Sequence, residues 1–217
     1  ISGARFFDID EISDKNSSLP HMLPSEEYFS SCVEGLGISN SNQVIIYDYE
    51  GLFSAPRVWW MFRAFGHKNV SILSGGLNSW IKENRPTSSE LTKIEPGTFK
   101  AKLNKHSVAS KLQLKENLKT KESLVIDARS SQRFNGSEPE FRPGVKSGHI
   151  PGSKNLPYQF FLNEKGFLLK ADQIKNVLTK ADVDLNKSII STCGSGVSAC
   201  VLGLGLELLG KNNWEIY

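Results

Sequence analysis

The sequence is poor in cysteine, with three among 217 residues, and no two of them form a Cys-x-x-Cys pair. The odd number argues against a disulfide framework. The spacing argues against a zinc knuckle and against a thioredoxin-type dithiol. These absences favour a reducing compartment.

The sequence also lacks a strong charge of one sign and a long hydrophobic run. Its formal net charge is +3 with scattered lysines, so nucleic acid is not an expected partner. No uninterrupted apolar run approaches the ~20 residues of a membrane-spanning helix, so no membrane partner is expected. A composition of 39% hydrophobic and 23% charged residues is typical of one large or two small globular domains.

One pattern occurs twice along the chain: a short apolar strand, a loop, a helical stretch, a turn with Gly and Asn, and a second strand. The first copy covers residues 44–73 and the second covers residues 188–217. Short apolar strands that alternate with helical stretches indicate parallel sheets covered on both faces. The sequence therefore predicts an α/β fold with two homologous domains, each a parallel sheet flanked by helices.

The polar segment at residues 87–114 lacks firm periodicity and is the predicted linker. It separates an N-terminal domain at 1–86 from a C-terminal domain at 115–217. A Gly-Gly turn and a Trp-containing helix follow the first copy, but nothing equivalent follows Tyr217. The strand near Leu124 likewise has no counterpart before Ile1. We therefore expect the start of the first domain and the end of the second to be missing from this sequence.

Cys193 is the first candidate for chemistry, because it directly follows an apolar strand and opens a glycine-rich turn before a helix. Gly194 and Gly196 let the backbone bend so that successive N–H groups point inward, and the helix adds the positive end of its dipole. These surroundings would stabilise a thiolate, the reactive form of cysteine. The alternative is a small buried hydrophobe at a strand end. The first copy has the run from Asp48 to Phe53 here and no cysteine, so only the C-terminal copy is predicted to do thiol chemistry.

A second candidate group is cationic and follows the strand near Leu124. Arg133 and Arg142 lie on a loop rich in Gly and Pro, where their side chains can converge. A guanidinium matches a carboxylate bidentately and keeps its charge at any working pH, so two arginines near a nucleophile suggest a small carboxylate-bearing substrate. The alternative pairs these arginines locally with Glu138 and Glu140 as surface salt bridges. The residues alone leave both interpretations open.

The remaining histidines and apolar residues are predicted to be structural. His149 lies in a Gly-His-Ile-Pro-Gly turn and is expected to support the backbone, whereas His67 is expected to face solvent. The second cysteine of the C-terminal copy, Cys200, falls at helical spacing among apolar residues and is expected in the core. The same expectation holds for an aromatic cluster formed by Trp59, Trp60, Phe62 and Phe65.

Three motifs carry a resemblance to a known family: Cys193-Gly-Ser-Gly-Val-Ser-Ala, Arg133-Phe-x-Gly-x-Glu-Pro-Glu-x-Arg142 and Gly148-His-Ile-Pro-Gly152. With these motifs, nearly the whole chain resembles the 3-mercaptopyruvate sulfurtransferases of the tandem rhodanese family. The resemblance implies two rhodanese-like domains, an inactive N-terminal one and a catalytic C-terminal one. In that family, Gly-Ser after the cysteine is typical of mercaptopyruvate enzymes and Arg-Lys of thiosulfate enzymes. Gly194-Ser195 therefore points to mercaptopyruvate, with a thiosulfate:cyanide sulfurtransferase as the alternative.

The resemblance also implies a role for each site residue. Cys193 would attack the substrate sulfur and hold it as a persulfide while pyruvate leaves. Arg133 and Arg142 would bind the carboxylate and the carbonyl oxygen of the substrate, where a fixed cation stabilises the enolate charge of the transition state. The backbone N–H groups that would stabilise the sulfur species belong to Gly194, Gly196, Val197 and Ser198.

A proton relay of Asp10, His21 and Ser195 is also implied by the resemblance. An imidazole that titrates near ~6.5 suits proton transfer, and an adjacent carboxylate would fix its tautomer. Asp8 competes with Asp10 for the carboxylate role.

The implied donors are 3-mercaptopyruvate or thiosulfate, and the implied acceptors are thioredoxin, a small thiol or cyanide. No metal and no cofactor is expected, and the expected location is cytoplasmic or mitochondrial. Two rival classes are distinguishable. A cysteine phosphatase would need an arginine where Ala199 stands. A non-enzymatic binding module would be indicated if alkylation of Cys193 left every activity unchanged.

Overall fold

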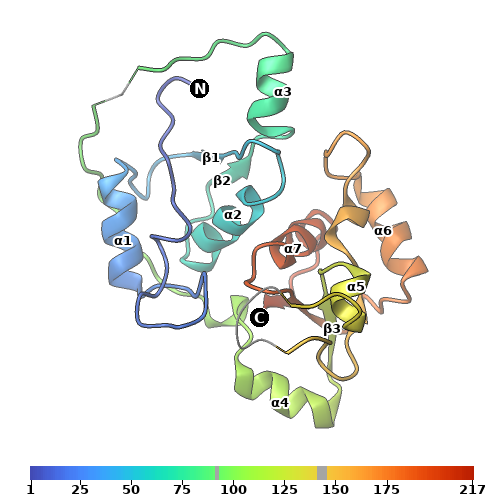
Figure 1. Cartoon of the computed structure of the whole chain (residues 1–217). Coiled ribbons are helices and arrows are strands. Elements are labelled where there is room, and N and C mark those ends of the chain that lie inside the picture. Colours follow the sequence, from blue (N-terminus) through green and yellow to red (C-terminus); the bar gives the residue numbers. More distant parts are fainter. Residues whose placement is uncertain (91–92, 141–145) are drawn as a thin grey trace. The chain divides into compact units, whose positions relative to one another are not determined.

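The computed structural model describes residues 1–90, 93–140 and 146–217 (Figure 1). The chain divides into two compact units, Ile1–Asn104 and Lys105–Tyr217. None of the helices in these described ranges has the length and apolar character that a membrane span requires.

The boundary between the units falls inside the segment 87–114 that is expected to link the domains. Its later residues bond to the first unit: the N–H of Ala101 donates to Ser30 Oγ at 2.9 Å, and the N–H of Asn104 donates to the carbonyl of Ala64 at 2.7 Å. A helix begins before the segment ends, with Ser110 as its N-cap in a capping box. The first unit thus continues past residue 86, and the second starts before residue 115.

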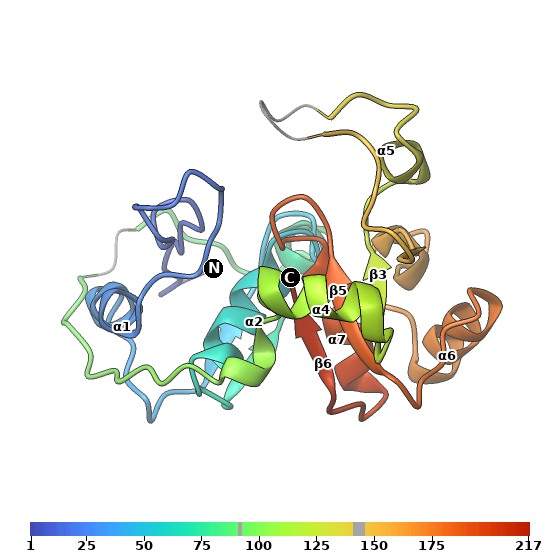
Figure 2. The same cartoon turned by 90° about the horizontal axis from the view of Figure 1, so that it is seen from below.

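The second unit contains a four-stranded parallel sheet in the order β4-β3-β5-β6. Its strands are β3 (Ser123–Asp127), β4 (Lys154–Asn155), β5 (Ser188–Thr192) and β6 (Trp214–Ile216). Its helices are α4 (Lys111–Thr120), α5 (Ser131–Asn135), α6 (Ala171–Lys180) and α7 (Ala199–Leu208), with 3-10 turns at Lys105–Ser107 and Tyr158–Phe161. Figure 2 shows β3, β5 and β6 side by side, with α4 in front of them.

Helices cover both faces of this sheet, as expected for parallel strands. Ile126 and Ile189 lie on the face that packs against α6 and α7, in a core that includes Phe161. Val125 and Ile190 lie on the opposite face with Leu114 of α4. The apolar side chains of β3 and β5 therefore alternate between two cores. Because the two strands pair in parallel, with Asp127 opposite Thr192, their carboxyl ends lie side by side.

The first unit contains the parallel pair β1 (Val44–Ile46) and β2 (Val70–Ile72). Its helices are α1 (Glu26–Gly35), α2 (Ala55–Ala64) and α3 (Gly76–Lys82). Aromatic side chains make up much of its core. The rings of Phe29 and Phe65 are stacked with centroids 4.2 Å apart, and Phe62 and Phe99 meet edge to face. The aromatic cluster of α2 is buried, which confirms the prediction that it belongs to the core.

The predicted repeat is confirmed, since β1-α2-β2 and β5-α7-β6 have the same order and parallel pairing. Both helices have ten residues. In each copy the loop before the helix leaves the carboxyl end of a strand, where ligands of parallel α/β sheets bind.

Candidate active site

Cys193 follows the last residue of β5 and is partly exposed, at the start of the loop that leads into α7. Its Sγ accepts a hydrogen bond from the backbone N–H of Gly196 at 3.1 Å. Gly196 has φ of 73°, in the left-handed region that favours glycine. The loop thus turns an N–H group back onto the sulfur, as the sequence predicts.

The rest of the loop leads directly into the helix. Gly194 is exposed, Ser195 and Ser198 are partly exposed, and Val197 is buried. Ser198 occupies the N-cap position of α7 without a side-chain capping bond. The first turn of α7 therefore begins within the loop that carries Cys193, and its dipole presents positive charge there. Cys200 is fully buried in α7, as predicted.

The first copy fills the equivalent loop with a carboxylate. Asp48 accepts backbone N–H bonds from Phe53 at 2.9 Å, Ser54 at 2.7 Å and Ala55 at 2.8 Å, and a further one from Gly51. These N–H groups belong to the loop and to the first residue of α2. The side chain of Asp48 therefore occupies the anion-binding end of α2 from within.

The loop after β3 begins with a buried ion pair. Arg129 Nε donates to Asp127 Oδ1 at 3.0 Å, and Arg129 Nη2 donates to Asp127 Oδ2 at 2.6 Å and to the carbonyl of Gly148 at 2.7 Å. The side chains of Asp127 and Arg129 are 2% and 8% exposed. Hydrogen bonding to Asp127 raises the pKa of the Arg129 guanidinium above its ordinary value.

Arg133 lies on α5 and pairs with Glu140. Both carboxylate oxygens of Glu140 lie 2.7 Å from Arg133 Nη2, and Oε2 lies 3.4 Å from Arg129 Nη1. The local pairing that the sequence leaves open is therefore present, but with Glu140 and in a buried setting, whereas Glu138 is exposed. Arg142 lies outside the described residues.

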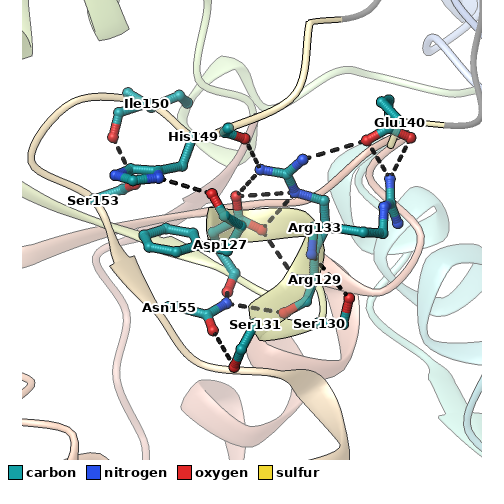
Figure 3. A network of polar contacts seen from close by, with 12 residues as sticks. Asp127, Arg129, Ser130, Ser131, Arg133, Glu140, His149, Ile150, Ser153 and Asn155 are labelled. Atoms are coloured by element: carbon teal, nitrogen blue, oxygen red, sulfur yellow. Dashed lines mark hydrogen bonds and ion pairs between the residues drawn. The ribbon is translucent and has the colours of Figure 1, made fainter. Parts of the chain in front are cut away.

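Backbone and side-chain bonds hold this loop against β4. Asn155 of β4 donates to the carbonyls of Asp127 at 3.1 Å and Arg129 at 2.9 Å, as Figure 3 shows. His149 Nδ1 lies 2.8 Å from the carbonyl oxygen of Phe134, and the two rings are stacked at 3.8 Å. These contacts support the backbone, in keeping with the structural role predicted for His149.

The two predicted relay residues of the first unit are in contact. His21 Nε2 lies 2.8 Å from Asp10 Oδ1. Asp8 instead accepts the N–H groups of Asp10 and Glu11, at 2.9 and 3.2 Å, so Asp10 is the carboxylate beside the imidazole. The Nδ1 atom of His21 is buried and has no hydrogen-bond partner among the residues that the structure describes.

The backbone of His21 is held in an unusual conformation. Its φ is 57°, which is uncommon for a residue other than glycine. Its carbonyl accepts a hydrogen bond from Arg57, a buried residue of α2. The guanidinium of Arg57 also lies 4.6 Å from the ring centroid of Trp60. Helix α2 therefore fixes the position of this histidine.

Comparison with known proteins identifies the family. The model of the rhodanese-like domain matches residues 1–83 and 110–216. The chain belongs to the rhodanese family.

Relatives in this family carry two different names. The chain is 45% identical over 219 residues to human 3-mercaptopyruvate sulfurtransferase, covering 100% of this chain and 74% of the relative. It is also 45% identical over 220 residues to bovine thiosulfate sulfurtransferase, again covering 74% of the relative. The crystal structure of the 3-mercaptopyruvate sulfotransferase SseA from Escherichia coli matches with a TM-score of 0.91 and 39% identity, covering 100% of this chain and 81% of SseA.

Three charged residues of this rhodanese chain are not among the residues predicted from its sequence. Arg129 and Asp127 form the buried pair at the end of β3, and Asp48 holds the loop before α2. Each of the two aspartates directly follows or ends an apolar strand. A charged residue at the end of a buried apolar strand needs a partner. The sequence therefore contains a signal for a paired charge at Asp48 and at Asp127.

Proposed function

We propose that this rhodanese-family chain is a sulfurtransferase that moves sulfur from 3-mercaptopyruvate through a persulfide on Cys193 to a thiol or cyanide acceptor, with release of pyruvate. The observation that carries the proposal is the N–H of Gly196 directed at Cys193 Sγ from 3.1 Å. A thiolate is stabilised by such a donor and by the helix N-terminus behind it. The relatives' names support the substrate class.

The chemistry proceeds in two steps. The Cys193 thiolate attacks the sulfur of 3-mercaptopyruvate, an S–S bond forms, and the C–S bond breaks with its electrons on the enolate of pyruvate. The enolate then takes up a proton. In the second step, the acceptor attacks the outer sulfur of the persulfide, and Cys193 leaves as a thiolate. Backbone N–H groups of Gly194, Gly196, Val197 and Ser198 would stabilise the negative sulfur in both steps.

Arg133 would bind the carboxylate end of the donor. β3 and β5 are adjacent and parallel, so their carboxyl ends meet at one edge of the sheet. Cys193 follows one strand, and the loop with Arg133 follows the other. We assign Arg142 to the carbonyl oxygen of the donor, where a cation would strengthen its interaction as enolate charge develops.

The relay of Asp10, His21 and Ser195 would supply the proton that the enolate takes up. The 2.8 Å contact between Asp10 and His21 Nε2 supports it, because a carboxylate on one ring nitrogen leaves the other for proton transfer. An Asp10→Asn change is expected to lower kcat for the mercaptopyruvate step more than it raises KM.

The donor preference is tested by comparing two substrates on the same protein. Pyruvate release from 3-mercaptopyruvate is expected to have a kcat/KM at least about tenfold above that of sulfite release from thiosulfate, a difference of about 1.4 kcal/mol. Cys193→Ser should abolish both reactions. Cys32→Ser, which removes a partly exposed thiol in the other unit, is the control and should leave both unchanged.

A faster reaction with thiosulfate would overturn the donor assignment and favour a thiosulfate:cyanide sulfurtransferase. That alternative has its own support in the equally similar bovine relative. Activity that survived Cys193→Ser would instead overturn the mechanism.

The acceptor and the compartment are also proposals. Thioredoxin or a small thiol would accept the sulfur, and cyanide would serve in vitro. We propose a cytoplasmic or mitochondrial location, and the name of one Arabidopsis relative, which is 43% identical, places that protein in mitochondria.

A further inference from the structure

We propose that Glu140 is a positioning residue for Arg133, and that the chain of charges Asp127, Arg129, Glu140 and Arg133 sets the orientation in which Arg133 receives the donor carboxylate (Figure 3). This inference rests on the proposed function, because it assigns Arg133 to donor binding. It adds a residue that makes no contact with the substrate.

Glu140 is held by cations rather than by water. Its side chain is 3% exposed, and both of its oxygens lie 2.7 Å from Arg133 Nη2. A carboxylate removed from water is stable only while it is paired and hydrogen-bonded, since loss of one partner leaves a buried charge without compensation. The contact with Arg133 is therefore maintained, not incidental.

Arg129 connects Glu140 to the sheet. It has bidentate contact with Asp127, the last residue of β3, and it also donates to the carbonyl of Gly148. Its Nη1 atom lies 3.4 Å from Glu140 Oε2. The position of the Glu140 carboxylate is thus set by the buried Arg129, which is itself held by the last residue of β3.

Arg133 itself stands on a short helix of five residues, and its side chain has several rotatable bonds. Holding such a side chain in one rotamer opposes ~2 kcal/mol of rotamer entropy. A guanidinium is planar and carries its N–H donors in a rigid fork, so a bond at Nη2 fixes the orientation of the whole plane. Glu140 therefore prepares Arg133 for binding before the donor arrives.

The test separates the loading of sulfur from its discharge. Glu140→Gln keeps the shape of the side chain but removes the charge that holds Arg133. Single-turnover loading of sulfur is measured by intact-protein mass spectrometry. The concentration of 3-mercaptopyruvate that gives the half-maximal rate is expected to rise about tenfold, because one charge-assisted contact is lost. Discharge of a persulfide formed beforehand at saturating donor should be unchanged.

Glu138→Gln is the matched control, because Glu138 is an exposed glutamate of the same loop. It should change both half-reactions by less than about twofold, as expected for an exposed charge. If Glu140→Gln does not fold, Glu140→Asp, which keeps the charge, should fold and show a smaller rise in the half-saturating concentration.

Three results would overturn the proposal: an unchanged half-saturating concentration, tighter donor binding because Glu140 competes with the substrate, or equal slowing of loading and discharge. Failure of the proposed function is distinguishable from all three, because the wild-type protein would then load no sulfur from 3-mercaptopyruvate.

Discussion

Asp48 and Cys193 stand at the carboxyl ends of corresponding strands and show how single residues separate the two copies. In the first copy a carboxylate accepts the N–H groups of the loop and of the start of α2. In the second copy the sulfur of Cys193 receives the N–H of Gly196. In the first copy, the N–H groups at the start of the helix are therefore already bonded to a side chain of the same loop. This agrees with the inactive role expected for that domain.

Asp48→Ala should destabilise the first unit by about 2 kcal/mol, because several N–H groups lose a charged acceptor. Chemical denaturation measures the change. Glu50→Ala is the control, since it removes an exposed acid from the same loop and should shift the free energy of unfolding by less than about 0.5 kcal/mol. Equal effects of the two changes would show that the Asp48 bonds do not hold the loop.

His67 corrects the sequence prediction that it faces solvent. It is 3% exposed, and its ring lies 5.6 Å, between centroids, from both Phe62 and Phe99. Polarity and position in a turn suggested exposure, but the turn after α2 folds back onto the aromatic core. Burial lowers the pKa of the His67 imidazole below its ordinary value.

This pKa shift predicts a dependence of stability on pH. The unfolded chain binds a proton near pH ~6.5 and the folded chain binds it at lower pH, so stability falls as the pH drops below about 6.5. The slope attributable to His67 is at most about 1.4 kcal/mol per pH unit. Denaturation between pH 7.5 and 5 should show this slope in the wild type and a flatter one in His67→Gln. Removal of an exposed imidazole in His106→Gln is the control, and an unchanged slope in His67→Gln would contradict the assignment.

Helix α7 shows what the sequence fixes at the scale of an element and what it leaves open. The apolar spacing predicts the helix and its burial, but not why two glycines interrupt it. A Cβ added to Gly205 would lie 2.4 Å from a ring atom of Phe161, and one added to Gly203 would lie 2.5 Å from Trp214. These glycines let the helix approach its neighbours closely.

Gly205→Ala should therefore destabilise the second unit by about 1–3 kcal/mol, because the fully buried Phe161 ring must shift. Gly35→Ala in α1 is the matched control, since no atom lies within 4 Å of the added Cβ. That change should stabilise by up to about 1 kcal/mol through helix propensity alone. Thermal unfolding of both variants measures the difference, and stabilisation by Gly205→Ala would show that the helix does not need the close approach.

The loop after β3 shows a different limit of sequence reasoning. The sequence presents Glu138 and Glu140 as equal partners for the arginines, and only the folded loop distinguishes them. Glu140 is drawn inward by Arg129, whose own position depends on the end of β3 and on the carbonyl of Gly148. These contacts depend on the order of the strands and on the path of the loop. The hydrophobic periodicity of the sequence carries no information about either.

At the scale of the whole molecule, the repeat was the most informative sequence feature. It predicted the two α/β units, the parallel strands and the strand end on which Cys193 lies, because hydrophobic period and turn residues are local signals. It also predicted that the two copies differ at one loop. The ion pair of Asp127 and Arg129 is local, since the two residues are two positions apart, but its further contacts with the carbonyl of Gly148 and with Glu140 depend on the path of the loop and are not predicted from the sequence.

The central claim, that Cys193 carries the transferred sulfur, is tested most directly by intact-protein mass spectrometry after addition of 3-mercaptopyruvate. The wild-type protein should gain the mass of one sulfur atom, fragmentation of the peptides should place that sulfur on Cys193, and an acceptor thiol should remove it. Cys193→Ser should gain nothing. An active protein that shows no sulfur adduct, or one that carries the adduct on Cys32 or Cys200, would contradict the account.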